Sequence, residues 1–296
     1  MLALSSSSGS FSKVAVFRLV MSCPDRVGIV ARVSRFLADH NGSILEANHH
    51  ADLEQGWFFM RNEIKASSLP FDAQELARQF APIAEELGMT WRVTDSDQRP
   101  RLALMVSRDS HCLADILNRW HSGDLHCDIA CIISNHDSLR SLAEWHAIPF
   151  FHVPVDPADK APHFAEVERL IEQHAADTVV LARYMQILPA DLCARMPYRV
   201  INIHHSFLPS FIGAKPYHQA YERGVKLIGA TCHYVTADLD AGPIIDQDVI
   251  RVSHRDEIED MVRLGKDCER TVLARGLRWH LEDRVLVHGN KTVVFN

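Results

Sequence analysis

Between residues 102 and 203, short apolar runs alternate with amphipathic stretches, and this alternation restricts the fold more than any other feature. The runs are Leu102–Val106, Asp128–Ile133, Phe150–Val153, Thr178–Leu181 and Val200–Ile203. Stretches with helical spacing, such as Leu113–Trp120 and Phe164–His174, lie between most of them. Strands that alternate with helices predict an α/β domain, with a parallel sheet covered by helices on both faces. Ligands of such sheets bind beyond the carboxyl ends of the strands.

The first third of the chain predicts a second, smaller domain. Apolar residues at helical spacing follow the first strand, and a second helical stripe has Asp72 near its start as an N-cap. The expected elements are Ala15–Met21, Val27–Leu37, Ser43–His50, Trp57–Ile64, Phe71–Leu87 and Thr90–Val93. This order of strand, helix, two strands, helix and strand is the ferredoxin-like βαββαβ unit.

A polar stretch without periodicity, 94–101, separates the two patterns and contains a proline, as expected of a linker. We therefore predict a disordered, serine-rich lead-in over 1–12 and the βαββαβ domain over 13–94. A linker over 95–101 and the larger α/β domain over 102–296 follow. The C-terminal part predicts one long amphipathic helix and then a terminal hairpin.

Composition excludes several classes of protein. The net charge of −7 argues against a nucleic-acid-binding surface, which requires clustered Lys and Arg. No apolar run is long enough to span a membrane, and the first residues do not resemble a signal peptide. The seven scattered cysteines favour reduced thiols in a cytoplasmic protein. The 18 histidines do not form a known metal-binding pattern, so we expect no metal.

Two short motifs carry the groups that chemistry on a carbonyl requires. Asn202 and His204 lie two residues apart, so a strand presents both side chains on one face. Asp240 precedes Ala241-Gly242-Pro243, a sequence typical of a sharp turn that exposes the carboxylate. A carboxamide, an imidazole and a carboxylate can polarise a carbonyl, hold its oxyanion and move a proton. The alternative is that the histidine is structural and the aspartate only a turn residue.

Over residues 102–252 these motifs resemble the folate-dependent formyl-transfer family, which joins an Asn-x-His strand to a Leu-Asp-x-Gly-Pro loop. The pair His204-His205, the segment 182–189 and the loop 213–217 are similar to those of the formyltetrahydrofolate deformylases. The resemblance implies a Rossmann-like formyltransferase domain that hydrolyses 10-formyltetrahydrofolate to formate and tetrahydrofolate, in one-carbon and purine metabolism. It implies no cofactor beyond the folate substrate.

The same resemblance assigns roles to individual residues. Water attacks the formyl carbon, Asp240 handles the proton, and His204 with Asn202 stabilises the oxyanion. Backbone groups of the segment after Arg183 meet the edge of the pterin, while apolar side chains wall its ring. Arg183 contacts either the folate tail or a nearby carboxylate, and His205 orients a neighbour or contacts water. The substrate-binding candidates are Arg183, Met185, Gln186, Ile187, Leu188 and His205.

Three other functions remain as alternatives. A formyltransferase would use the same donor with an amine acceptor such as glycinamide ribonucleotide. In such transferases a glycine-rich loop cradles the phosphate, whereas Ser107–Leu113 contains no glycine. A tRNA acceptor would call for an added basic domain, which the short tail after 281 does not provide. A non-catalytic folate sensor and a metal hydrolase are the remaining possibilities.

The stretch Cys23–Val30 resembles the opening of an ACT domain, a module that senses small molecules. A glycine at the start of the first helix lets a ligand approach the backbone. The resemblance implies a small amino-acid effector near Asp25, Gly28 and Ile29, and a homo-oligomer joined through exposed sheet edges. The alternative is that Asp25 only caps the helix and Gly28 only packs tightly.

Overall fold

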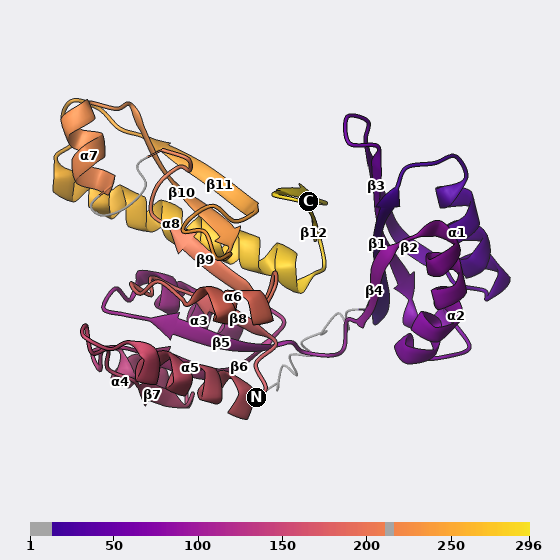
Figure 1. Ribbon diagram of the computed structural model, residues 1–296, viewed down its shortest axis with the longest axis horizontal. Helices are drawn as coiled ribbons and strands as arrows, with labels where there is room; N and C mark the ends of the chain where they lie inside the picture. Colours follow the sequence, from indigo (N-terminus) through magenta and orange to yellow (C-terminus); the bar gives the residue numbers. More distant parts are fainter. Residues whose placement is uncertain (1–13, 211–215) are drawn as a thin grey trace, which may run out of the picture. The chain divides into compact units, whose positions relative to one another are not determined.

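The computed structural model describes residues 14–210 and 216–296, and the chain divides between Gln98 and Arg99 into two compact units. That division falls inside the stretch 95–101. The lead-in expected over 1–12 and the loop residues 213–215 lie outside the described residues. Figure 1 shows the elements of both units, which are described separately below.

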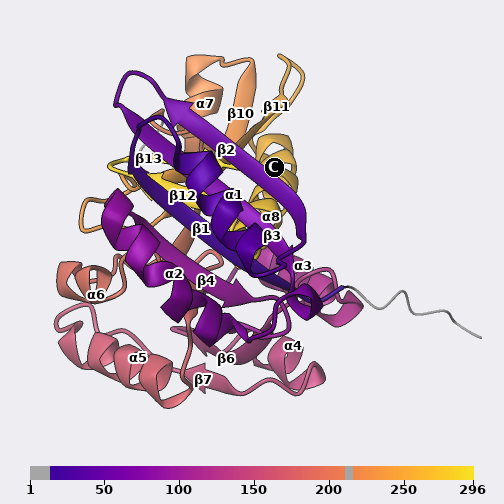
Figure 2. The ribbon, with the colours of Figure 1, turned by 90° about the vertical axis from the view of Figure 1, so that its right-hand side faces the viewer.

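The first unit is a four-stranded antiparallel sheet in the order β2-β3-β1-β4. Its elements are β1 (Val16–Pro24), α1 (Ile29–Asp39), β2 (Ile44–Asp52), β3 (Trp57–Lys65), the 3-10 turn η1 (Ala66–Ser68), α2 (Ala73–Leu87) and β4 (Thr90–Asp95). Figures 1 and 2 show α1 and α2 on the same face of this sheet. Leu19, Phe36 and Phe80 belong to the buried core between the sheet and the helices. The predicted βαββαβ order is confirmed.

The two helices of this unit begin in different ways. The carboxylate of Asp72 accepts a hydrogen bond of 2.9 Å from the backbone N–H of Glu75, so the predicted N-cap of α2 is confirmed. Helix α1 begins at Gly28, whose φ of 96° lies in the left-handed region that favours glycine. No side chain caps the start of α1.

The second unit is a seven-stranded sheet in the order β11-β10-β9-β8-β5-β6-β7. Its elements are β5 (Arg101–Val106), α3 (His111–Ser122), β6 (Asp128–Ser134), α4 (Arg140–Trp145), β7 (Phe150–His152), α5 (Ala161–Gln173), β8 (Thr178–Leu181), α6 (Ala190–Arg195), β9 (Val200–His204), α7 (Pro216–Arg223), β10 (Leu227–Tyr234), β11 (Ile244–Arg251), α8 (Ile258–Leu281), β12 (Val285–His288) and β13 (Lys291–Val294). Strands β5 to β9 run parallel, whereas β10 and β11 are antiparallel to their neighbours. The prediction of a mostly parallel sheet is confirmed.

Helices cover both faces of this sheet. Leu102 and Leu104 of β5 belong to the apolar cluster that contains residues of α3, α4 and α8. Ala103 and Met105, which alternate with them, belong to the cluster that contains residues of α5 and α6. A strand buried on both faces reads as a continuous apolar run, which explains the pattern of 102–106.

The alternation of strands and helices did not predict β10 and β11. Strand β10 contains Gly229, where a Cβ atom would lie 2.4 Å from the backbone oxygen of Asp248, so the two strands approach closely only with glycine there. Strand β10 also pairs with β9, and this register places His233 opposite Asn202. The predicted terminal hairpin is present as β12 and β13.

Two further features bear on the environment of the protein. All seven cysteines are buried and carry free thiols, as expected. Among the described residues, no helix has the combination of length and apolar character that crossing a membrane requires.

Candidate active site

A buried histidine and a buried carboxylate meet beyond the end of β9. His204 is the last residue of that strand, and its Nδ1 lies 3.3 Å from Oδ2 of Asp240. Their side chains are only 5% and 9% exposed. Asp240 has a φ of 53°, so the turn between β10 and β11 holds it in the left-handed region. The structure thus brings together the imidazole and the carboxylate that the two motifs supply.

The charges of this pair follow from its surroundings. Burial raises the pKa of Asp240, but the hydrogen bond and charge of His204 outweigh it and bring the pKa below its ordinary value. Asp240 is therefore ionised at neutral pH. Across the ring, Nε2 of His204 is buried and has no hydrogen-bond partner among the described residues. This nitrogen can meet a substrate oxygen.

Asn202 is oriented by His233, a residue that the sequence did not single out. Nδ1 of His233 lies 2.9 Å from the backbone oxygen of Tyr234, to which it donates. Burial lowers the pKa of His233, which favours the neutral ring. Nε2 of this ring can then accept from Nδ2 of Asn202 at 3.2 Å. The second N–H of the Asn202 amide remains for a substrate oxygen.

The antiparallel pairing of β9 and β10 was the signal that could have revealed His233. In this register Thr231 lies opposite His204, and His233 lies opposite Asn202. Both members of Thr231-x-His233 therefore lie beside the Asn202-x-His204 pair, because side chains alternate along each strand. His233 Nε2 also lies 3.8 Å from Oδ1 of Asp240, so it belongs to the same cluster.

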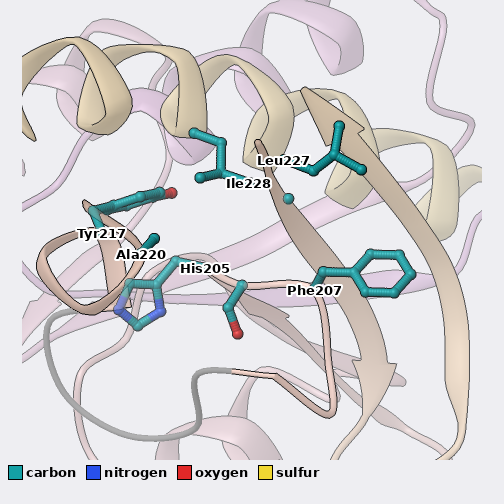
Figure 3. Close-up of a pocket in the computed structure, with 8 residues that line it drawn as sticks. His205, Phe207, Tyr217, Ala220, Leu227 and Ile228 are labelled. Carbon is teal, nitrogen blue, oxygen red and sulfur yellow. The ribbon is translucent and has the colours of Figure 1, made fainter. Parts of the chain in front are cut away.

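His205 is the next residue after His204, and the two rings lie close together. The centre of its ring is 5.2 Å from that of His204 and 6.1 Å from that of Tyr217. Burial and then the charge of Arg183 lower the pKa of His205 to about 4, so its ring is neutral at physiological pH. It lines a small pocket of about 30 Å³, space for about two water molecules. Figure 3 shows His205 and Tyr217 on one side of that space, and Phe207 and Leu227 on the other.

The segment proposed for the pterin divides into exposed and buried residues. The side chains of Met185 and Ile187 are 55% and 62% exposed, and Gln186 is partly exposed. Leu188 is instead buried in the apolar cluster that contains residues of α5 and α6. The backbone N–H of Met185 donates to Oγ of Ser107 at 3.0 Å, which ties this segment to the end of β5.

Arg183 points at two carboxylates. Its Nη2 lies 3.2 Å from Oδ2 of Asp109, and its Nε lies 3.4 Å from Oε2 of Glu269. Glu269, on α8, is 1% exposed and also accepts from the hydroxyl of Tyr217 at 2.6 Å. His111 Nε2 lies 2.8 Å from the carboxylate of Glu269. Of the two contacts considered for Arg183, the carboxylate is the one seen within the described residues.

One group of side chains could hold a metal ion. Ligand atoms of His111, Cys112 and Glu269 lie within 4.8 Å of one another. The guanidinium of Arg183 lies 3.4 Å from Oε2 of Glu269, the oxygen that His111 also contacts, so it already supplies a positive charge there. Burial, followed by the charge of Glu269, raises the pKa of the Cys112 thiol well above its ordinary value, so the sulfur keeps its proton. This arrangement fits a buried ion-pair network better than a metal centre.

In the first unit, the surroundings of Gly28 are open. Among the described residues, apart from Gly28 and its two chain neighbours, no atom lies within 4 Å of the place where a Cβ would stand, so the alternative that Gly28 packs tightly is wrong. Asp25 does not cap α1, and its backbone N–H donates to the oxygen of Gly56 at 2.8 Å. Ile29 is 2% exposed and belongs to the apolar core, so its side chain does not line this open surface.

The fold and the site define a two-domain protein whose larger unit is a formyl transferase domain. The formyl transferase family matches residues 100–277, and the ACT domain family matches residues 17–65. A Synechocystis formyltetrahydrofolate deformylase is 50% identical over 277 residues, which cover 94% of this chain and 97% of that protein. The chain belongs to the formyltetrahydrofolate deformylase family.

Solved structures support the same assignment. The crystal structure of a formyltetrahydrofolate deformylase from Pseudomonas syringae is 69% identical, covers 97% of this chain and 96% of its own, and has a TM-score of 0.96. A glycinamide ribonucleotide transformylase from Symbiobacterium toebii is 29% identical, covers 67% of this chain and 95% of its own, and has a TM-score of 0.63. The transformylase therefore shares one part of the fold, whereas the deformylase shares nearly all of it.

Proposed function

We propose that this chain hydrolyses 10-formyltetrahydrofolate to formate and tetrahydrofolate, with Asn202, His204 and Asp240 as the catalytic residues. The observation that carries the proposal is the contact of 3.3 Å between His204 and the ionised Asp240, with Nε2 of His204 left without a partner among the described residues. The membership of this chain in the formyltetrahydrofolate deformylase family supports the same reaction.

The reaction follows from the groups present. The oxygen of a water molecule forms a bond to the formyl carbon, and the proton of that water passes to Asp240. Electrons of the carbonyl double bond move to the formyl oxygen, where His204 and the free N–H of Asn202 stabilise the negative charge. The tetrahedral intermediate then collapses, the bond from carbon to N10 breaks, and the nitrogen takes the proton from Asp240. Formate and tetrahydrofolate leave.

Each contact has a part in these steps. Nδ1 of His204 lies beside the carboxylate of Asp240, and a ring that carries protons on both nitrogens donates from Nε2 to the oxyanion. His233 holds the amide of Asn202 by accepting from it, and so leaves the second N–H aimed elsewhere. The exposed side chains of Met185 and Ile187 suit a wall for the pterin ring, with Gln186 between them. None of these steps requires a metal ion.

The test is formate release from purified protein and 10-formyltetrahydrofolate, with a chelator present and with or without glycinamide ribonucleotide. We expect formate in amounts equal to the folate consumed, in both mixtures. Formate that vanishes with chelator would instead indicate a metal hydrolase. Formyl transfer that occurs only when glycinamide ribonucleotide is supplied would identify the chain as a transferase.

We also propose that the ACT-like unit binds a small amino-acid effector and that the chain forms a homo-oligomer. The open space around Gly28 at the start of α1 supports the first proposal, with Asp25 close by in the sequence. The buried, free thiols support a cytoplasmic location, where cysteines stay reduced. Calorimetric titration with the common amino acids, and sedimentation of the full chain, test the effector and the oligomer.

A further inference from the structure

A charge network, buried at Glu269 and partly exposed at Asp109 and Lys266, joins three parts of the second unit. It consists of Asp109, His111, Arg183, Lys266 and Glu269. Arg183 contacts Asp109 at 3.2 Å and Glu269 at 3.4 Å, and Nζ of Lys266 lies 3.4 Å from the other oxygen of Asp109. His111 contacts Glu269 at 2.8 Å. The loop after β5, the loop after β8 and helix α8 are thereby tied together.

This network lies beside the reacting groups. Arg183 and Glu269 are among the charges that act on His205, and the ring of His205 is 5.2 Å from that of His204. Asp109 follows β5, so it stands beyond the carboxyl end of a central parallel strand, where such sheets bind their ligands. A co-substrate that enters along this edge meets the network.

The network balances its own fixed charges. Arg183 and Lys266 supply two positive charges, and Asp109 and Glu269 supply two negative ones. A phosphate group would need these same cations as hydrogen-bond donors. The carboxylate of Asp109 already pairs with Arg183 and Lys266, and its negative charge would repel a phosphate at that place. The segment 107–113 contains no glycine that would open the backbone to such an anion.

We propose that Asp109, supported by Glu269, determines acceptor specificity: their carboxylates take the place of an external anion and exclude phosphate-bearing amine acceptors, so water remains as the acceptor. This inference rests on the proposed hydrolysis and extends it to the choice of acceptor. Asp109 suits this role because its side chain is 34% exposed and so accessible to a solute, whereas that of Glu269 is 1% exposed.

The test is calorimetric titration of the full chain with inorganic phosphate at constant ionic strength. Asp109→Asn leaves Arg183 and Lys266 without their shared carboxylate, so we expect phosphate to bind at least about tenfold more tightly than to the wild type. Asp109→Glu keeps the negative charge and should exclude phosphate as the wild type does. Asp115→Asn is the matched control, because Asp115 pairs with Arg119 on α3 and lies outside the network.

Two results would overturn the inference: equal phosphate affinity in the wild type and Asp109→Asn, or equal gains in Asp109→Asn and Asp115→Asn. Asp109→Ser provides a second removal of the carboxylate if Asp109→Asn does not fold, as judged by thermal melting. Formate release is measured separately on the wild type. Normal formate release without a gain in phosphate binding contradicts only this inference, whereas absence of formate contradicts the proposed hydrolysis.

Discussion

Among the described residues of the second unit, His204 with Asp240 and His111 with Glu269 are buried pairs of a histidine and a carboxylate, and their carboxylates have different partners. His204 and Asp240 are 3.3 Å apart, and Nε2 of His204 has no partner among the described residues. In the other pair His111 lies 2.8 Å from Glu269, whose two oxygens also receive the Tyr217 hydroxyl and face Arg183. Nδ1 of His111 is likewise buried without a partner among the described residues, so the two pairs differ at the carboxylate. Asp240 contacts histidines, whereas Glu269 contacts His111, Tyr217 and Arg183.

This difference separates reactive from structural polar groups inside one fold. A buried polar atom without a partner costs free energy, and a substrate oxygen can supply the bond that Nε2 of His204 lacks among the described residues. A saturated buried carboxylate needs no ligand, and its removal leaves a buried cation unpaired. Substitutions in the two pairs should therefore affect different quantities: turnover at Asp240 and stability at Glu269.

The largest effect is expected at Asp240. Asp240→Asn removes the group that we propose accepts and returns the proton, so kcat for formate release should fall by about a thousandfold or more, with little change in thermal stability. Asp238→Asn, in the same turn and exposed, is the control and should keep wild-type turnover. An active Asp240→Asn would show that the proton is handled by another group.

The next largest effect is expected at Glu269, the carboxylate of the second pair. Glu269→Gln leaves Arg183 with Asp109 as its carboxylate partner within the described residues, so it should lower the free energy of unfolding by about 3 kcal/mol at pH 7. Glu259→Gln, which is exposed on the same helix, is the control. Chemical denaturation of the three proteins measures the difference. A stability equal to that of the wild type would mean that the network contributes nothing.

The pH dependence of that difference has a definite sign. Burial raises the pKa of Glu269, but the hydrogen bond from His111 and the charge of Arg183 bring it below its ordinary value of 4.5. A carboxyl whose pKa is lowered by folding stabilises the protein above its unfolded pKa, and this contribution disappears as the pH falls through the folded pKa. The gap between the wild type and Glu269→Gln should therefore narrow below about pH 4.5.

The sequence predicts the two pairs to different extents. The sequence predicts Asn202, His204 and Asp240 as site residues because two local motifs carry them, and period-two alternation places the first two on one face. The pair of His111 and Glu269 was not found, since the two residues are 158 positions apart and no local pattern joins them. Parallel strands and their helices were predicted from apolar periodicity, which reports burial directly.

His233 shows the same limit on a shorter scale. Its role depends on the register of β10 against β9, and β10 is an antiparallel strand whose pairing with β11 shifts register between Cys232 and His233. Apolar periodicity does not fix such a register. Arg183 was predicted to meet the folate tail or a carboxylate, and only the three-dimensional arrangement shows which carboxylates lie near it.

A smaller effect on turnover is expected at His233, which contacts Asn202 and lies near Asp240. His233→Leu removes the acceptor for the amide of Asn202, so kcat should fall by about tenfold. His233→Gln supplies an acceptor oxygen and should lose less. In the double variant with Asn202→Ala, the Leu substitution should cost little more, because its partner is already gone. Additive losses would show that His233 does not act through Asn202.

The smallest effect is expected at Tyr217, whose hydroxyl contacts the carboxylate of Glu269. Tyr217→Phe removes the hydroxyl that donates to Glu269, so the free energy of unfolding should fall by about 1 kcal/mol. Tyr221→Phe is the control, because Tyr221 is exposed on the same helix. Thermal melting compares the variants. A larger loss in Tyr221→Phe than in Tyr217→Phe would contradict the assigned contact.

The most direct test of the central claim is single-turnover conversion of 10-formyltetrahydrofolate in water enriched in oxygen-18, with a chelator and without any amine. We expect formate that carries one oxygen-18 atom, because one oxygen comes from the formyl group and one from the attacking water. Asp240→Asn should nearly abolish its formation. Formate without oxygen-18, or no formate until an amine acceptor is added, would contradict the claim that water is the acceptor.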